Sequence, residues 1–204
     1  IHYSIEAFDL AAHLFRVTLT IDEPDRNGQL FRLPAWIPGS YMIREFARHI
    51  VQIRATSRGE SVSLKKLDKH SWQAEPCRGP LSLEYEVYAW DLSVRSAHLD
   101  KTHAFFNGSS VFLEVVGRHD CAHIVDIKKP DDPAARTWRV ATALPEYGAK
   151  RYGFGTYIAT DYDELIDCPV EIGDFILGQF DAYGTLHEIA VTGRVPHLDM
   201  KRIE

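Results

Sequence analysis

Two histidines in the segment His119-Asp-Cys-Ala-His123 have the spacing of a metal-binding helix, on which residues four positions apart share one face. The residues that follow, Ile124-Val-Asp-Ile-Lys128, alternate between apolar and polar as a strand does. An extended chain would hold the two histidines about 13 Å apart, which is too far for one ion. We therefore expect no zinc site at this motif.

Three further patterns that could carry chemistry are incomplete. Gly153-Phe-Gly155 lacks the third glycine of a nucleotide-binding loop. Ser109-Ser110 has no partner base that the sequence reveals. The acidic residues of 161–171 lack the ligand spacing of a calcium loop and instead suit the first turn of a short helix. No catalytic residue and no metal ligand is therefore assigned within this chain.

The segment from Trp36 to His49 is dense in aromatic and charged residues and turns sharply at Pro38-Gly39. Loops that carry such groups between two strands are common binding sites, which makes Tyr41, Arg44 and Glu45 candidates for contact with a substrate or with another domain. The alternative is a packed crossover in which Trp36, Tyr41 and Phe46 fill the core while the charges pair locally.

Composition excludes some classes of partner. The 204-residue chain carries a formal net charge of −6, so we expect no nucleic-acid partner, and no run of about 18 apolar residues predicts a membrane span. The three cysteines are isolated in the sequence and are typical of a cytoplasmic protein with reduced thiols, although a disulfide between two of them is an alternative.

Alternation with a period of two dominates the chain and predicts an all-β fold, an antiparallel β-sandwich of two packed sheets. A short helix near 162–168 is expected, with Asp161 as its N-cap and Pro169 as its end. The expected strands are Ile1–Phe8, His13–Ile21, Gln29–Leu33, His49–Thr56, Ser71–Glu75, Leu81–Trp90, Val111–Val116, His123–Lys128, Thr137–Ala141, Glu171–Phe180 and His187–Thr192.

The two ends predict that the chain is a piece of a longer protein. It starts at Ile1, already inside an alternating pattern, and its last residues resemble the beginning of a helix after Pro196. We expect one β-sandwich domain over residues 1–194, with 195–204 as the start of a linker or helix that leads into a missing catalytic domain.

Four stretches in order resemble the N-terminal part of the glycyl aminopeptidase family, which are zinc metallopeptidases that also carry a PDZ domain. These stretches are Leu33–Ile50, Ala104–Leu113, Trp138–Pro145 and Asp161–Gly173. The catalytic His-Glu-x-x-His motif of that family does not occur in this sequence. The resemblance implies that zinc and the catalytic residues belong to the missing catalytic domain and that this chain alone is not an enzyme.

The resemblance also implies a role and a site. The domain is expected to pack on the catalytic domain and to help shape the cleft for a peptide substrate, with Asn107, Gly108 and Ser109 near the substrate's free amine. The alternative for Asn107-Gly108 is a type I′ hairpin turn without a ligand. The alternative for the whole chain is a stand-alone β-sandwich module that binds a peptide or a sugar.

Overall fold

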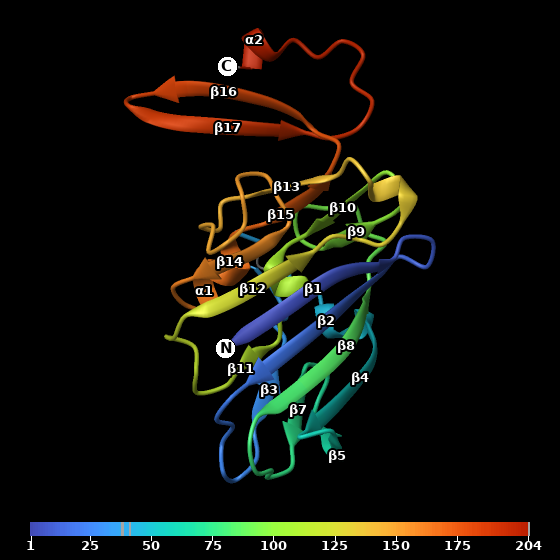
Figure 1. The fold of residues 1–204 in the computed structure, drawn as a ribbon, viewed down its shortest axis with the longest axis vertical. Helices are drawn as coiled ribbons and strands as arrows, with labels where there is room; N and C mark the ends of the chain where they lie inside the picture. Colours follow the sequence, from blue (N-terminus) through green and yellow to red (C-terminus); the bar gives the residue numbers. More distant parts are fainter. Residues whose placement is uncertain (38, 41, 204) are drawn as a thin grey trace.

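A computed structural model describes residues 1–37, 39–40 and 42–203 and shows a sandwich of β-sheets (Figure 1). One layer is a seven-stranded sheet, antiparallel except for the parallel pair β1–β12. Its strands, in spatial order, are β14 (Gly155–Ala159), β12 (His123–Lys128), β1 (His2–Asp9), β2 (Leu14–Ile21), β8 (Leu81–Tyr88), β4 (Ile50–Ser57) and β5 (Glu60–Val62).

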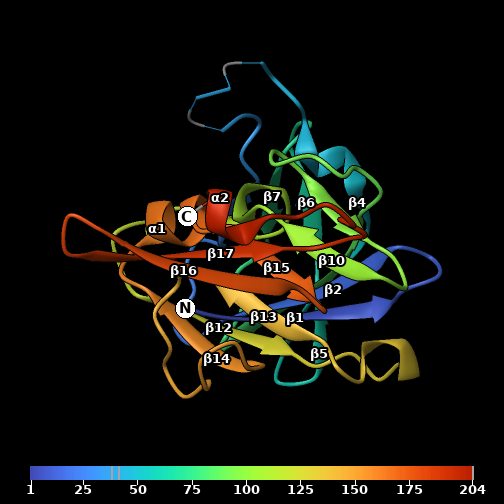
Figure 2. The same ribbon diagram turned by 90° about the horizontal axis from the view of Figure 1, so that it is seen from above.

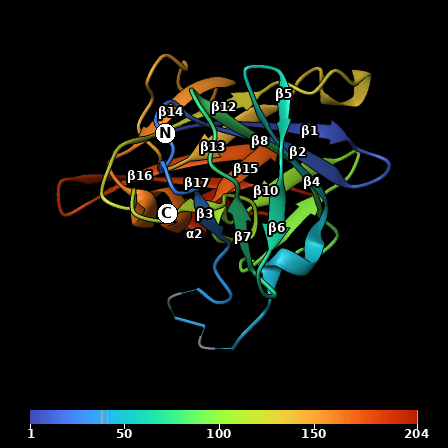
Figure 3. The same cartoon turned by 90° about the horizontal axis from the view of Figure 1, so that it is seen from below.

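The facing layer is divided into two four-stranded sheets. The first contains β13 (Arg139–Thr142), β15 (Val170–Gly173), β10 (His103–Phe106) and β9 (Ala97–Leu99). The second contains β11 (Glu114–Val115), β3 (Leu30–Arg32), β7 (Ser71–Ala74) and β6 (Leu64–Lys66). Figure 2 and Figure 3 show these strands stacked against the seven-stranded sheet. The predicted all-β sandwich is therefore confirmed, with its second layer in two parts.

A separate hairpin, β16 (Ile176–Ala182) and β17 (Thr185–Val191), lies beyond β13 and β15 at the end of the molecule that carries the C-terminus (Figure 1). Short helical turns complete the described chain: η1 (Phe46–His49), η2 (Gly108–Ser110), η3 (Pro133–Ala135), α1 (Tyr162–Asp167) and α2 (Met200–Ile203). No helix in the described part of the chain is both long enough and apolar enough to cross a membrane.

The alternation read from the sequence corresponds to burial. In β2 the side chains of Phe15, Val17, Leu19 and Ile21 are buried, and the residues between them are partly exposed. The two layers meet through these side chains, as when Phe15 of β2 packs edge-on against Phe106 of β10 with ring centroids 5.5 Å apart. Burial of one face of each strand stabilises the sandwich.

The expected strand Val111–Val116 is wrong in its first half, because only Glu114–Val115 pairs as a strand. Three buried tyrosines instead bind the carbonyl oxygens of residues 111–113. Tyr85 donates to Val111 at 2.7 Å, Tyr162 donates to Phe112 at 2.7 Å and Tyr3 donates to Leu113 at 2.8 Å. The Tyr85 hydroxyl also accepts from the Leu113 N–H at 3.2 Å. Side-chain hydroxyls thus take the place of the backbone hydrogen bonds that a neighbouring strand would supply. Burial raises the pKa of all three tyrosines.

Other boundaries also differ from expectation. The single expected strand Glu171–Phe180 is broken at 174–175 into β15 and β16. The segment Gly155–Ala159 is not among the expected strands and forms the edge strand β14. The strands β5, β6, β9 and β10 were not expected; three of them have three residues and β10 has four, which is too few for a recognisable period.

The expected helix forms as α1, and Asp161 caps it by accepting a hydrogen bond from the Glu164 N–H at 2.8 Å. The Glu164 carboxylate reaches back to Thr160, whose N–H and hydroxyl donate to it at 2.6 and 2.7 Å. This reciprocal arrangement, one residue wider than a standard capping box, fixes the start of the helix.

Candidate functional site

A hollow of about 610 Å³ lies where α1, η2 and the segment after β3 meet. Its lining joins parts of the chain that are far apart in sequence: Ile37, Asn107, Ser109, Asp161, Asp163, Glu164, Ile166 and Asp167. The sequence prediction placed Asn107 and Ser109 near a substrate, and the structure puts both on this hollow. The acidic wall opposite them was not predicted to belong to a site.

The turn at Asn107 is a cap of η2. The Asn107 side-chain oxygen accepts from the Ser109 N–H at 3.2 Å and from the Ser109 hydroxyl at 2.7 Å, and its amide donates to the Val94 carbonyl at 3.4 Å. Asn107 has a φ of −90°, so the type I′ turn, which needs a positive φ there, is wrong. Because both of its acceptor positions are engaged, Asn107 positions the turn.

Gly108 is buried against the backbone of α1. A Cβ at this position would lie 2.6 Å from the Leu165 carbonyl oxygen and 2.8 Å from the Ile166 Cα. Glycine is therefore required here by the close approach of two backbones. This contact fixes the distance between η2 and the acidic side of the hollow.

The four carboxylates of the hollow are engaged differently. Asp161 and Glu164 accept hydrogen bonds at the start of α1. Asp163 lies 3.3 Å from the Nε2 of His119. Asp167 is exposed and has no hydrogen bond or ion pair with any residue that the structure describes. The hollow therefore presents one uncommitted negative charge beside the apolar Ile37 and Ile166.

Two of the predicted residues of the loop after β3, Arg44 and Glu45, make separate contacts. Glu45 has a positive φ of 51° and pairs with Lys69 at 2.5 Å, and the hydrogen bond from Lys69 lowers the pKa of Glu45. Arg44 donates to the Ser40 hydroxyl at 3.3 Å. Tyr41 lies outside the described residues. Glu45 is thus paired with a residue outside the loop, whereas Arg44 makes a hydrogen bond to a neutral hydroxyl within it.

The apolar residues of this loop divide between core and surface. Phe46 is buried, whereas Trp36, Met42 and Ile43 are 47%, 66% and 67% exposed. The loop runs outward from the sandwich (Figure 2 and Figure 3). Apolar side chains exposed on one loop are suited to contact another protein or domain.

His119 and His123 are neighbours, with the His123 Nε2 3.5 Å from the His119 carbonyl oxygen, but their imidazoles have different surroundings. His119 lies between two carboxylates, with Glu114 at 3.4 Å from Nδ1 and Asp163 at 3.3 Å from Nε2. Burial opposes protonation of His119, but the two carboxylates outweigh it and raise its pKa. His123 is fully buried, and burial lowers its pKa to about 4. These opposite shifts reflect two separate environments.

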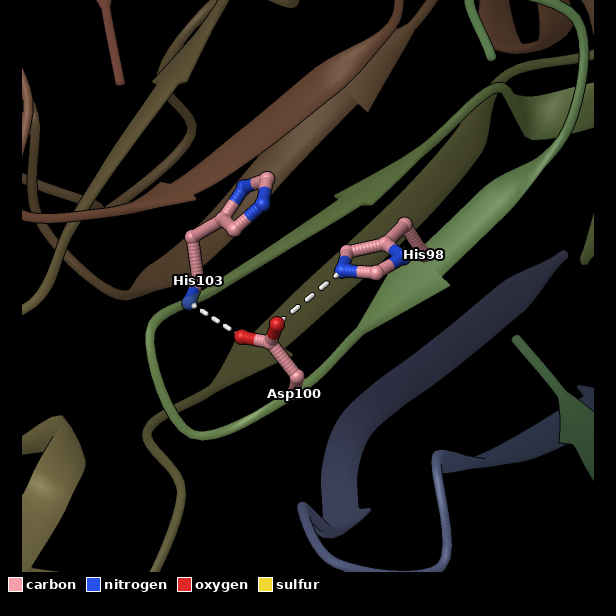
Figure 4. Close-up of side chains that lie close together, drawn as sticks. All are labelled: His98, Asp100 and His103. Carbon is pink, nitrogen blue, oxygen red and sulfur yellow. Dashed lines mark hydrogen bonds and ion pairs between the residues drawn. The ribbon is translucent and has the colours of Figure 1, made fainter. Parts of the chain in front are cut away.

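One group of described residues has donor atoms close enough to share a metal ion: His98, Asp100 and His103. They lie on the β9–β10 hairpin, away from the hollow, with Asp100 at the turn between the two histidines (Figure 4). Sequence reasoning missed this group because the His-x-Asp-x-x-His spacing gains meaning only once a hairpin forms. The turn composition of His98-Leu-Asp-Lys-Thr-His103 was the available signal.

Comparison with known proteins finds one matching family and several similar structures. The Peptidase M61 N-terminal domain family matches residues 2–174. The crystal structure of an aminopeptidase N family protein from Idiomarina loihiensis is 42% identical, with a TM-score of 0.94 over 99% of this chain and 34% of that chain. An M1 zinc metallopeptidase from Deinococcus radiodurans is 12% identical, with a TM-score of 0.45 over 88% of this chain and 43% of that chain.

No curated protein matches the chain. The chain spans about a third of the length of the Idiomarina protein. The family match covers most of the sandwich, from β1 through β15. By this match and by its likeness to the Idiomarina structure, the chain belongs to the peptidase M61 N-terminal domain family.

Proposed function

We propose that the chain is the non-catalytic N-terminal domain of a zinc-dependent aminopeptidase that resembles glycyl aminopeptidases. The sequence contains no His-Glu-x-x-His motif, so the catalytic zinc of such an enzyme would be held by residues outside this chain. The domain would pack on the catalytic domain through the exposed apolar loop with Trp36, Met42 and Ile43. A PDZ domain would complete the protein.

The observation that carries the proposal is the uncommitted Asp167 carboxylate in the hollow. An aminopeptidase must hold a protonated amine at the end of its substrate, and a carboxylate without a partner is suited to bind an ammonium group. Ile37 and Ile166 beside it would contact a small side chain. In this proposal the hollow forms part of the wall around the amino end of the peptide.

The test uses the longer enzyme and the substitution Asp167→Asn. We expect KM to rise about tenfold for glycyl peptides with a free amino terminus, because one charge-assisted hydrogen bond is weakened. The turnover number should change less than KM. Asp131→Asn is the matched control, since Asp131 is exposed and lies outside the hollow.

Two results would contradict the proposal. One is a longer protein without aminopeptidase activity, which would remove the proposed enzyme altogether. The other is an equal KM for Asp167→Asn and Asp131→Asn, which would separate the hollow from substrate binding while leaving the packing role in place.

A further inference from the structure

The β9–β10 hairpin brings two imidazoles and a carboxylate to one side of its sheet. His98 lies opposite Phe105 in the antiparallel register, and His103 is two residues from Phe105, so both histidines share a face. Leu99 and Ala104 occupy the other face and are fully buried in the core. The donor atoms of His98, Asp100 and His103 all lie within 4.8 Å of one another (Figure 4).

His103 is oriented by a carboxylate on its outer side. Its Nδ1 lies 2.9 Å from an oxygen of Glu171, on the neighbouring strand β15. The Thr192 hydroxyl donates to that same Glu171 oxygen at 2.8 Å. An imidazole that donates Nδ1–H to a carboxylate keeps a free lone pair on Nε2, which is how protein histidines are prepared to bind a metal.

Asp100 is held by its turn through one oxygen alone. That oxygen accepts from the Thr102 N–H and hydroxyl, both at 2.6 Å, and from the His103 N–H at 3.1 Å. Within the described part of the chain, the second oxygen has one polar contact, with the Nε2 of His98 at 3.3 Å. The carboxylate is thus fixed in place while one oxygen stays available as a ligand.

The hydrogen bonding of His98 is incomplete. Its side chain is 8% exposed, and its Nδ1 is buried without a hydrogen-bond partner among the residues that the structure describes. The ring is held between Trp90, which stacks on it at 5.0 Å, and the ring of His103, also at 5.0 Å. The Nε2 of the ring faces Asp100, so this is the nitrogen that a metal ion beside the Asp100 carboxylate would contact (Figure 4).

The donor set indicates the class of ion. Two imidazoles and one carboxylate suit Zn²⁺ and neighbouring divalent transition metals, whereas Ca²⁺ and Mg²⁺ prefer oxygen ligands alone. The Asp100 side chain is 26% exposed, so solvent reaches the cluster and water can fill the remaining coordination position. We propose that His98, Asp100 and His103 bind a divalent transition-metal ion, with Zn²⁺ as the expected occupant and Glu171 as the residue that positions His103.

Calorimetric titration of the 204-residue chain with Zn²⁺ tests this proposal. We expect one ion per chain. Asp100→Asn keeps an oxygen for the turn but loses the anionic ligand, and His103→Gln removes an imidazole. Glu171→Gln should weaken binding about 10- to 100-fold, and the two ligand substitutions should weaken it more. His119→Gln is the matched control and should bind Zn²⁺ as the unchanged chain does. His119 also lies beside two carboxylates, but Glu114 and Asp163 contact opposite nitrogens of its ring and do not form a common site.

X-ray absorption at the zinc edge of the unchanged chain provides a second measurement that needs no variant. Scattering from two imidazoles is expected. Absence of stoichiometric binding, absence of imidazole scattering, or equal affinity in Asp100→Asn and the unchanged chain would each overturn the proposal. These outcomes are independent of aminopeptidase activity, so they leave the proposed function of the domain unaffected.

Discussion

The Leu165 carbonyl oxygen occupies the space into which a side chain at Gly108 would project, 2.6 Å from an ideal Cβ. This approach joins η2 directly to α1, whose carboxylates form the opposite side of the hollow. A glycine that looked like part of a hairpin turn in the sequence therefore sets the width of the candidate site.

Replacing Gly108 by alanine should destabilise the domain by about 1–3 kcal/mol, because the added methyl group forces two backbones apart. The free energy of unfolding in urea measures this effect. A loss below about 0.5 kcal/mol, the range of ordinary surface substitutions, would mean that α1 moves away freely.

Tyr85→Phe should cost about 1–3 kcal/mol, since it leaves the Val111 carbonyl and the Leu113 N–H buried without their partner. Tyr88→Phe on the same strand is the control, because Tyr88 is 39% exposed and its ring only meets His13 edge-on. Thermal unfolding of both variants measures the difference. Equal stabilities would show that water replaces the Tyr85 hydroxyl.

Asn107→Ala should lower the free energy of unfolding by about 0.5–2 kcal/mol, because η2 loses its cap. Asn107→Ser retains a side-chain oxygen that can cap and should recover part of that loss. Denaturant unfolding compares the two variants. If alanine and serine are equivalent, the cap contributes nothing to stability.

Stability should fall as the pH drops from about 6.5 to about 4, because His123 is buried in its neutral form. Burial lowers the pKa of His123 to about 4 in the folded chain, whereas the unfolded chain takes up a proton near pH 6.5. The unfolded state therefore binds more protons in this interval, and the folded state loses up to about 3 kcal/mol from this group.

His123→Phe removes this titration and keeps a ring between Tyr3 and Tyr162. Unfolding free energies of both proteins between pH 4 and pH 7 measure the effect, and other titrating groups cancel in the difference. We expect a shallower decline for the variant, and parallel curves would contradict the assignment.

The long strands could be predicted from the sequence for a simple physical reason. In Leu14–Ile21 and Leu81–Tyr88 one face must enter the core, so apolar residues recur at every second position over eight residues. Strands of three residues, such as Ala97–Leu99, do not repeat a period. The stretch Val111–Leu113 has strand-like composition, and only the fold shows that tyrosine hydroxyls take its carbonyls.

The candidate site could be predicted only in part. The resemblance to the glycyl aminopeptidase family pointed to Asn107, Gly108 and Ser109. In the structure, Asn107 and Ser109 line the hollow and Gly108 packs directly behind it. Ile37 and Asp167 face the same hollow although 130 positions separate them in the chain. Their proximity in space depends on the order of strands in both layers, and this order cannot be read from the spacing of residues in the sequence.

The three tyrosine hydroxyls that hold residues 111–113 come from β1, β8 and α1, and Gly108 accepts from the N–H groups of Val111 and Phe112. The turn beside the hollow is thus attached to buried side chains that come from β1, β8 and α1. When heating loosens these buried contacts, the turn should be displaced. The shape of the hollow and the packing of the core would then be lost at the same temperature.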